Sequence, residues 1–227
     1  MANFRKLRVW QAAQALAVLQ PAQLLDRADP ACVARFFLVL FHGAKIPQRS
    51  GTCRLGIHPL ANVLVGFHLD VKAHFGTVNQ IYNNAGIAYV GDVEVTPFKD
   101  IERVMDVDFW GVVNGTKAFL PHLIESGDGH VVNVSSIFGI FSGPGQAAYN
   151  SAKFAVRGFT EALRQEMLAN GHPVAVTTVH PGGIKTAIMR NSTAADGVDR
   201  ETLTSVFEKK LTMTTPEKAA KIILGGV

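Results

Sequence analysis

After residue 76, apolar runs of five or six residues alternate with longer amphipathic segments. The runs are rich in Val, Ile and Tyr, which favour extended strands. Each one gives way to a short stretch of Asn, Ser, Gly or Pro, which is typical of a chain leaving a buried strand. The pattern predicts three strands, at 78–82, 130–135 and 174–179.

The segments between these runs predict helices. Thr96 followed by Pro97 is typical of a helix N-cap with Pro at the first helical position, and we expect that helix to reach about Pro121. Gly171 is a typical stop signal, so a second helix is expected over about 149–170. Two more are predicted, near 200–211 and from Thr215 onward.

Strands that alternate with helices at this spacing predict an α/β fold with a parallel sheet and crossover helices. In such sheets the ligand binds at the carboxyl ends of the strands. Here those ends are Asn83–Gly86, Ser135–Ser136 and Pro181–Thr186, the least apolar parts of the region. We therefore expect the functional site to lie where they meet.

The first third of the chain does not continue this pattern. Its apolar run at 36–41 predicts a buried strand or a helix fragment, and a loop-like stretch comes next at 47–51. Up to residue 76 there are nine Lys or Arg and only three acids, whereas the rest carries thirteen basic and fifteen acidic residues. The net charge of +4 therefore comes from the first third.

Composition excludes several classes of protein. A chain of 227 residues with 48% apolar residues is globular rather than disordered or fibrous. We find no run of 18 apolar residues, so no transmembrane helix is predicted. Two cysteines cannot form a disulfide scaffold and indicate a reducing, cytoplasmic location. The basic residues are scattered without a nucleic-acid motif, so we expect no nucleic-acid partner, and we predict no metal site.

Tyr149 and Lys153 stand four residues apart, so they share one face of the predicted helix. A nearby ammonium lowers the pKa of a tyrosine toward neutrality and makes it a usable general acid or base. Ser136 stands at a strand end and could hydrogen-bond a substrate oxygen beside the tyrosine. Taken singly, the pair is also typical of a helix surface, and the serine of a turn or cap.

Three motifs resemble the short-chain dehydrogenase/reductase family over about residues 71–227. They are Asn83-Asn84-Ala85-Gly86 after a strand, Ser136 thirteen residues before Tyr149-x-x-x-Lys153, and Pro181-Gly182-x-x-x-Thr186 after the next strand. The resemblance implies a Rossmann-like doubly wound parallel sheet. It also implies hydride transfer between NAD or NADP and a small alcohol or carbonyl substrate, and it is compatible with a homo-oligomer.

The resemblance also implies roles for single residues. Tyr149 would donate and accept the proton, Lys153 would lower its pKa and hold the nicotinamide ribose, and Ser136 would polarise the substrate oxygen. The segment 187–212 would form a substrate lid. The implied cofactor-binding residues are Asn83, Ala85, Gly86, Tyr149, Lys153, Pro181, Gly182, Ile184 and Thr186.

Two departures from the family pattern concern the site and the sheet edge. Asp108 stands where the family often has a catalytic Asn, and we include it among the candidate catalytic residues. An ionised Asp accepts hydrogen bonds but donates none, and its charge could pair with Lys153 and weaken the effect of the lysine on Tyr149. The chain also ends near Gly225, where the family continues into a last strand, so an incomplete C-terminal edge is expected.

A third departure concerns the cofactor phosphates. The family opens with a strand and a Thr-Gly-x-x-x-Gly-x-Gly loop, whose backbone amides hold the pyrophosphate. The nearest imitation, Ser50–Ile57, has the wrong glycine spacing. Asp70 resembles an adenine-contacting Asp, but it lies only thirteen residues before Asn83, so residues 71–76 are better interpreted as the end of a helix.

These observations predict two regions: an atypical segment at 1–70 and a family-like catalytic region at 71–227. Our hypothesis is that the first is an out-of-frame translation or a decayed gene segment. The alternative is a divergent amino-terminal domain. The hypothesis requires another reading frame of the coding DNA to contain a strand followed by the Gly-rich loop. The alternative to an active oxidoreductase is a catalytically impaired family remnant that cannot bind dinucleotide.

Overall fold

The computed structural model describes residues 37–39, 68–69, 71–73 and 75–226. Strands and helices alternate through most of this region, as the sequence predicts. The strands are β1 (Phe37–Val39), β2 (Gln80–Asn83), β3 (Tyr89–Val90), β4 (Gly129–Val134), β5 (Val174–Val179) and β6 (Thr193–Ala194). The α-helices are α5 (Phe98–Met105), α6 (Gly111–Ser126), α7 (Ala147–Ala169), α8 (Arg200–Val206) and α9 (Pro216–Gly225). Short 3-10 or π turns form η1 (Asp106–Trp110), η2 (Ile137–Gly139) and η3 (Phe207–Leu211).

The central sheet is parallel. Within the described residues it has four strands in the order β1-β2-β4-β5, and β3 pairs with β6 in a separate two-stranded sheet. Ile81 of β2 lies opposite Val131 of β4, and both side chains are fully buried. This Rossmann-like arrangement confirms the predicted fold class and is consistent with the predicted incomplete sheet.

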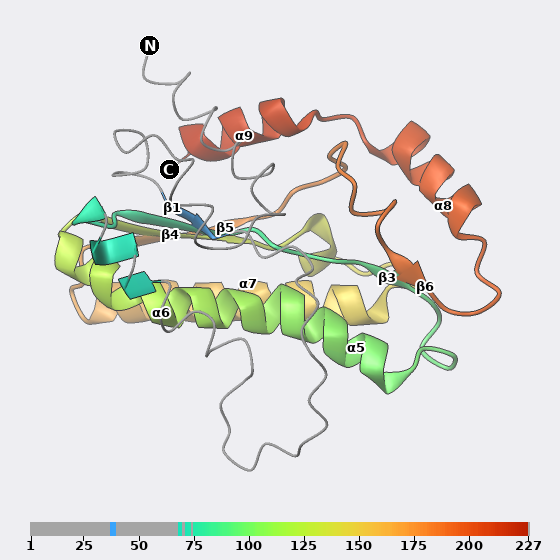
Figure 1. Ribbon diagram of the computed structural model, residues 1–227, viewed down its shortest axis with the longest axis horizontal. Helices are drawn as coiled ribbons and strands as arrows, with labels where there is room; N and C mark the ends of the chain where they lie inside the picture. The colour runs from blue at the N-terminus through green and yellow to red at the C-terminus, as the bar shows by residue number, and fades with distance from the viewer. Residues whose placement is uncertain (1–36, 40–67, 70, 74, 227) are drawn as a thin grey trace.

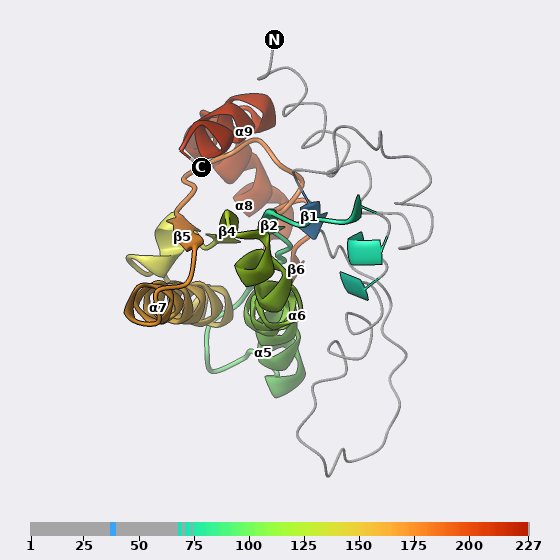
Figure 2. The same cartoon turned by 90° about the vertical axis from the view of Figure 1, so that its left-hand side faces the viewer.

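Helices cover both faces of the sheet. In Figure 1, α5, α6 and α7 lie below the strands, and α8 and α9 lie above them. The end-on view in Figure 2 shows α6 and α7 side by side under β2, β4 and β5. Apolar residues from these strands and helices form the core, including Ile81, Phe119, Leu123, Val131 and Leu163.

The helix predicted from Pro97 to about Pro121 starts and ends later. Pro97 is the N-cap and Thr96 points elsewhere, because its hydroxyl donates to the Asp92 carbonyl at 2.7 Å. Pro121 lies inside α6, where a proline removes one backbone hydrogen bond without ending this helix. The helix ends instead at Gly127, whose φ of 72° is the left-handed conformation that glycine adopts without strain.

A π turn, η1, joins α5 to α6. The Gly111 amide donates to the Asp106 carbonyl, five residues back, so the turn contains one residue more than an α-helical turn. Helical periodicity in the sequence does not reveal this extra residue. The turn carries Asp108 inward, and its side chain is fully buried.

Part of the first third joins the fold. β1 falls within the apolar run 36–41 and pairs in parallel with β2, which confirms the strand interpretation of that run. Residues 71–73 and 75 are helical, as expected for the end of a helix. Ser50–Ile57 and Asp70 lie outside the described residues.

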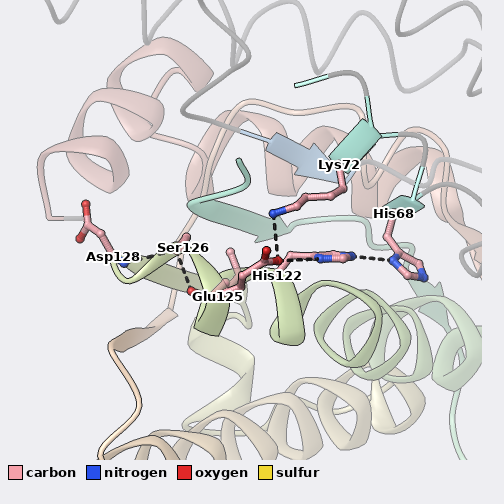
Figure 3. Close-up of polar contacts among 7 residues, drawn as sticks. His68, Lys72, His122, Glu125, Ser126 and Asp128 are labelled. Atoms are coloured by element: carbon pink, nitrogen blue, oxygen red, sulfur yellow. Dashed lines mark hydrogen bonds and ion pairs between the residues drawn. The ribbon is translucent and has the colours of Figure 1, made fainter. Parts of the chain in front are cut away.

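The helical residues before β2 contact the last turns of α6 through polar side chains (Figure 3). Lys72 Nζ lies 2.9 Å from Glu125 Oε2, and His68 Nδ1 lies 3.0 Å from His122 Nε2. The His68 ring also meets Phe119 edge-on, with the ring centroids 6.1 Å apart. We call these four polar residues, His68, Lys72, His122 and Glu125, the α6 clasp.

Within the described residues, no helix has both the length and the apolar character that crossing a bilayer requires.

Candidate active site

Tyr149 and Ser136 meet at the carboxyl end of β4. Tyr149 is half-buried in the first turn of α7, and its ring packs edge-on against Phe138 with the centroids 6.4 Å apart. Ser136 caps η2, because its hydroxyl accepts a hydrogen bond from the Phe138 amide at 3.1 Å. The Ser136 side chain also lies close enough to Tyr149 to lower the pKa of the tyrosine. The structure therefore brings together the two hydroxyls that the sequence pairs.

Lys153 lies one turn beyond Tyr149 on the same face of α7 and is 3% exposed. Its Nζ lies 5.6 Å from the centre of the Tyr149 ring and donates to the Val134 carbonyl at 3.2 Å. It also lies 3.2 Å from Oδ2 of Asp108. The lysine is thus held between β4, η1 and the tyrosine.

Asp108 is a buried carboxylate with two fixed contacts. Besides the ion pair with Lys153, its Oδ1 accepts a hydrogen bond from the Ile87 amide at 2.8 Å. This is the pairing between Asp108 and Lys153 that the sequence suggests. The η1 turn makes it by placing the carboxylate beside the loop after β2.

The pKa of Tyr149 is raised above its ordinary value of 10.0, which differs from the lowering that the sequence predicts. Burial is the largest cause of this rise. The Lys153 ammonium lowers the pKa, as expected, and so does the neighbouring Ser136 side chain, whereas the Asp108 charge raises it. In the protein without a ligand, the upward effects of burial and Asp108 on the Tyr149 pKa therefore outweigh the downward effect of Lys153.

The pKa values of Asp108 and Lys153 are also raised. Burial raises the pKa of Asp108, and the Lys153 ammonium only partly offsets this. Burial lowers the pKa of Lys153, but the neighbouring Asp108 and Tyr149 charges outweigh that effect. Lys153 therefore keeps its proton through the physiological range.

The segment Asn83–Gly86 lies beside this cluster. Asn83 is buried, and its side-chain nitrogen donates to Thr116 at 3.1 Å and to Asn133 at 2.7 Å. The side chain is therefore engaged inside the protein, and the half-buried Ala85 and Gly86 continue the loop beyond it. A Cβ at Gly86 would lie 3.3 Å from both Asp108 Oδ2 and Lys153 Nζ.

The segment after β5 approaches Ser136 from the other side. The His180 ring bonds the Ser136 carbonyl at 3.0 Å, and the Ile137 amide donates to the Pro181 carbonyl at 2.9 Å. Gly182 faces open space, with no atom within 4 Å of the position of a Cβ. Farther along, Ile184 pairs with Thr214, and the Thr186 amide donates back to the Ile184 carbonyl at 2.8 Å.

A cavity of about 590 Å³ lies near the site but does not contain its chemistry. It is bounded by residues 92–93, the glycine-rich loop 142–145 and the first turns of α7. Its lining includes Asn150 and Phe154 but neither Tyr149 nor Lys153. We therefore do not assign the cavity to the reaction.

Sequence reasoning assigns no role to three buried polar residues that surround the site, although Ser135 belongs to one of the predicted strand ends. Asn133 and Thr160 bond each other at 3.0 Å, and Ser135 bonds the backbone of Lys153 at 2.8 Å. One signal was available, because Asn133 is a polar residue inside the apolar run 130–134, and a buried polar side chain needs a partner.

Comparison with known proteins agrees with this geometry. The profile of the family described as short chain dehydrogenase matches residues 65–197. The SadH protein of Mycobacterium tuberculosis, whose name describes an oxidoreductase, is 68% identical over 161 residues, which are 70% of this chain and 58% of that protein. The dehydrogenase/reductase SDR family member 7B of Xenopus laevis is 37% identical over 157 residues, 67% of this chain and 46% of that protein.

Two solved structures share the fold. A short chain dehydrogenase/reductase from Burkholderia phymatum in complex with NAD has a TM-score of 0.65 at 22% identity, and the alignment covers 73% of this chain and 63% of that one. A short-chain dehydrogenase from Streptomyces avermitilis has a TM-score of 0.62 at 27% identity, covering 72% and 62%.

The chain thus spans about six-tenths of the length of SadH and less than half of the frog protein. The family match begins at residue 65, which agrees with the prediction that the first third lies outside the resemblance. Because the match extends over more than half of the residues, the protein belongs to the short chain dehydrogenase family.

Proposed function

We propose that the protein transfers hydride between NAD or NADP and a small alcohol or carbonyl compound, with Tyr149 as the general acid and base. One observation carries the proposal: Tyr149 and Ser136 lie together, with the Ser136 side chain close enough to lower the pKa of Tyr149 and the Lys153 ammonium 5.6 Å from the centre of the tyrosine ring. A substrate oxygen placed at this pair would meet one group that exchanges a proton and another that polarises it. The family assignment supports the same reaction type.

The residues present fit the nicotinamide half of a dinucleotide. Gly86 leaves free the space beside Lys153 that a side chain would fill, and Gly182 faces open space next to the segment that contacts Ser136. The NAD complex of the Burkholderia relative supports this cofactor class. The residues proposed to hold the group are Asn83, Ala85, Gly86, Tyr149, Lys153, Pro181, Gly182, Ile184 and Thr186. When bound, the dinucleotide supplies or accepts the hydride.

The remaining steps belong to the side chains of the protein. In alcohol oxidation, the Tyr149 phenolate takes the hydroxyl proton while Ser136 donates a hydrogen bond to the same oxygen. In carbonyl reduction, Tyr149 returns the proton to the forming alkoxide. The Lys153 ammonium stabilises the phenolate in both directions, and Asp108 opposes it. Lys153 is also the group proposed to bind the nicotinamide ribose hydroxyls.

Direct titration tests cofactor binding. The purified full chain is titrated with NADH and with NADPH up to millimolar concentrations, while nicotinamide fluorescence and thermal stability are monitored. We expect a change in fluorescence and a concentration-dependent rise in Tm with at least one of the two, because a ligand that binds only the folded state stabilises it. The absence of both responses at millimolar cofactor would contradict the proposal.

A tyrosine variant tests the chemistry. Tyr149→Phe should lower the turnover of a responsive alcohol or carbonyl by about 10²–10⁴-fold while cofactor still binds, because general acid-base catalysis contributes about that much. Tyr82→Phe is the matched control, since the Tyr82 hydroxyl bonds Gln80 within its own strand at 2.9 Å. Full turnover in Tyr149→Phe would refute the mechanism.

The alternative is that the protein is a remnant of the family that cannot bind dinucleotide. The comparisons do not favour it, but it is the interpretation that a negative cofactor titration would support. A homo-oligomer remains part of the proposal. Trp110 on η1 and Phe154 on α7 are 40% and 39% exposed and would suit contact with a second copy. Sedimentation of the full chain tests this, since a mass of 24.5 kDa in solution excludes it.

A further inference from the structure

Three consecutive residues of the β4 end contact α7 with polar groups. Asn133 bonds Thr160, the Val134 carbonyl accepts from Lys153 Nζ, and the Ser135 hydroxyl donates to the Lys153 carbonyl. Side chains alternate between the two faces of a strand, so Asn133 and Ser135 point to the same face. That face is covered by α7, and the next residue of the chain is the candidate catalytic Ser136.

The contact from Ser135 is short and buried. Ser135 is 3% exposed, and its Oγ lies 2.8 Å from the backbone oxygen of Lys153. Gly139 lies directly against both groups, where a Cβ would overlap the Ser135 hydroxyl and the Lys153 carbonyl. The serine hydroxyl is therefore closely packed between Gly139 and the backbone of α7.

The contact from Asn133 uses both ends of its amide. Its Nδ2 donates to Thr160 Oγ1 at 3.0 Å, and its Oδ1 accepts from Asn83 Nδ2 at 2.7 Å. Thr160 donates its own hydroxyl proton to the Val156 carbonyl at 2.7 Å. Asn133 is fully buried, so losing either partner would leave a polar group without one, which is costly.

We propose that Asn133 and Ser135 are positioning residues for the catalytic pair, which rests on the function proposed above. Their attachment points on α7, Thr160 and Lys153, are seven residues apart, about two helical turns along one face. A single bond would let the helix pivot about it, whereas two separated bonds fix both its position along β4 and its rotation. Tyr149 and Lys153 are thereby held opposite Ser136.

Two variants test the two attachments. Ser135→Ala removes the bond to Lys153, and Thr160→Val removes the partner of Asn133 while nearly keeping its shape. In both, we expect kcat to fall about three- to tenfold, the equivalent of one hydrogen bond, with KM changed less than about twofold. The acid limb of alcohol oxidation should move to higher pH, because a displaced Lys153 stabilises the Tyr149 phenolate less well.

Thr160→Ser restores the hydroxyl and should recover kcat to within about twofold. The control is Ser126→Ala at the far end of α6, where the serine hydroxyl also bonds a helix carbonyl, that of Leu123, at 2.7 Å. It should leave kcat and the pH profile unchanged. A lower Tm in Ser135→Ala and Thr160→Val with an unmoved kcat and pH profile would overturn the proposal, since a purely structural role predicts that result.

A readout without turnover separates this inference from the proposed function. The phenolate absorbance of Tyr149 is titrated with alkali, with Tyr149→Phe subtracted. We expect a higher midpoint in Ser135→Ala than in the natural chain or in Ser126→Ala. If the natural chain has no turnover, the proposed function fails and this titration still decides the inference, because an unmoved midpoint overturns it. If Ser135→Ala does not fold, Thr160→Val provides the same measurement.

Discussion

Asp108 is a departure from the family pattern that acts directly on the charges of the candidate site. Its carboxylate is buried against Lys153 and raises the pKa of Tyr149, so it counteracts the role proposed for the lysine. The fold holds this group in place through a π turn and a backbone hydrogen bond from Ile87. The effect can be removed without changing the shape of the side chain.

Asp108→Asn should shift alcohol oxidation to lower pH. The amide keeps an oxygen for the Ile87 amide and removes the charge, so the pKa of Tyr149 falls. Because oxidation requires the phenolate, the acid limb of the pH–rate profile moves down. Steady-state rates of the variant and the natural chain between about pH 5 and 10 measure the shift. An unmoved limb, or one moved to higher pH, would contradict the assignment.

Gly86 gives a second prediction at this scale. In Gly86→Ala, the new methyl group would lie 3.3 Å from both members of the ion pair, and it would occupy the space proposed for the nicotinamide ribose. We expect the Kd for NADH or NADPH to rise at least about fivefold, because overpacking a tight site typically costs about 1–3 kcal/mol.

Fluorescence titration measures this Kd. The control is Gly158→Ala, in the middle of α7, where nothing lies within 4 Å of the added Cβ. That variant should bind cofactor as the natural chain does and should gain stability of about 0.5–1 kcal/mol from its higher helix propensity. Equal affinities for Gly86→Ala and Gly158→Ala would place the ribose elsewhere.

Among the elements, the α6 clasp makes the contact between α6 and the helical residues before β2 sensitive to pH. Burial lowers the pKa of His68 below its ordinary value of 6.5, and the neighbouring His122 lowers it further. The folded state therefore binds this proton less readily than the unfolded chain. Stability contributed by neutral His68 is accordingly present above about pH 6.5 and is lost as the pH falls below it.

Urea unfolding at about pH 7.5 and 5.5, on either side of the ordinary histidine pKa, tests the clasp. His68→Gln should lose less stability than the natural chain between these two values, because it lacks the titrating group. His172→Gln, on the turn before β5, is the control and should behave as the natural chain. Lys72 lowers the pKa of Glu125, so a separate loss is expected only below about pH 4.5. Parallel pH dependences of His68→Gln and the natural chain would contradict the role of His68.

The elements also separate what the sequence could predict from what it could not. Strand positions are predictable from runs of β-branched residues, and the end of α7 is predictable from Gly171, which adopts a positive φ. The end of α6 at Gly127 is not predicted, because the sequence favours Pro121 as the end of that helix. The η1 turn cannot be predicted, because an extra residue in one turn leaves the apolar periodicity on either side intact. The motif position of Asp108 marks it as a candidate residue, but its complete burial depends on that unpredicted turn.

The same limit applies inside the site. Tyr149, Lys153 and Ser136 are recognisable from their spacing, and the fold brings them together. The rise in the Tyr149 pKa cannot be predicted from the sequence, because the burial that causes it depends on packing by Phe138 and the surrounding core. The contact between Ser135 and Lys153 is unpredictable for a similar reason, because the sequence around Ser135 does not show which helix lies against it.

At the scale of the whole molecule, the two proposed regions differ in what they offer the cofactor. Residues 71–227 contain the residues proposed for the nicotinamide half, whereas the sequence before residue 71 lacks the Gly-rich loop that would hold the pyrophosphate. We therefore expect most of the binding energy of the cofactor to come from contacts with residues 71–227. This difference predicts that the adenine half of the cofactor contributes little.

Comparison of NADH with reduced nicotinamide mononucleotide tests this expectation. Without the pyrophosphate loop, we expect the two Kd values to lie within about tenfold of each other, a difference of only about 1.4 kcal/mol. Isothermal titration of the full chain with each ligand measures both. A dinucleotide bound more than about a hundredfold tighter would show that residues 1–70 provide an equivalent phosphate site, as the divergent-domain alternative requires.

At η1, the number of residues in the turn matters as much as their identity. Each residue added to or removed from a helix rotates the rest of that helix by about 100°. Deleting one residue between Asp106 and Trp110 would restore ordinary helical pitch and rotate α5 relative to α6, so Asp108 and α5 could not both keep their present partners. In any set of homologous sequences, an alignment gap in these five positions would therefore mark a protein in which either the Asp108–Lys153 ion pair or the packing of α5 differs, even if every candidate catalytic residue were retained.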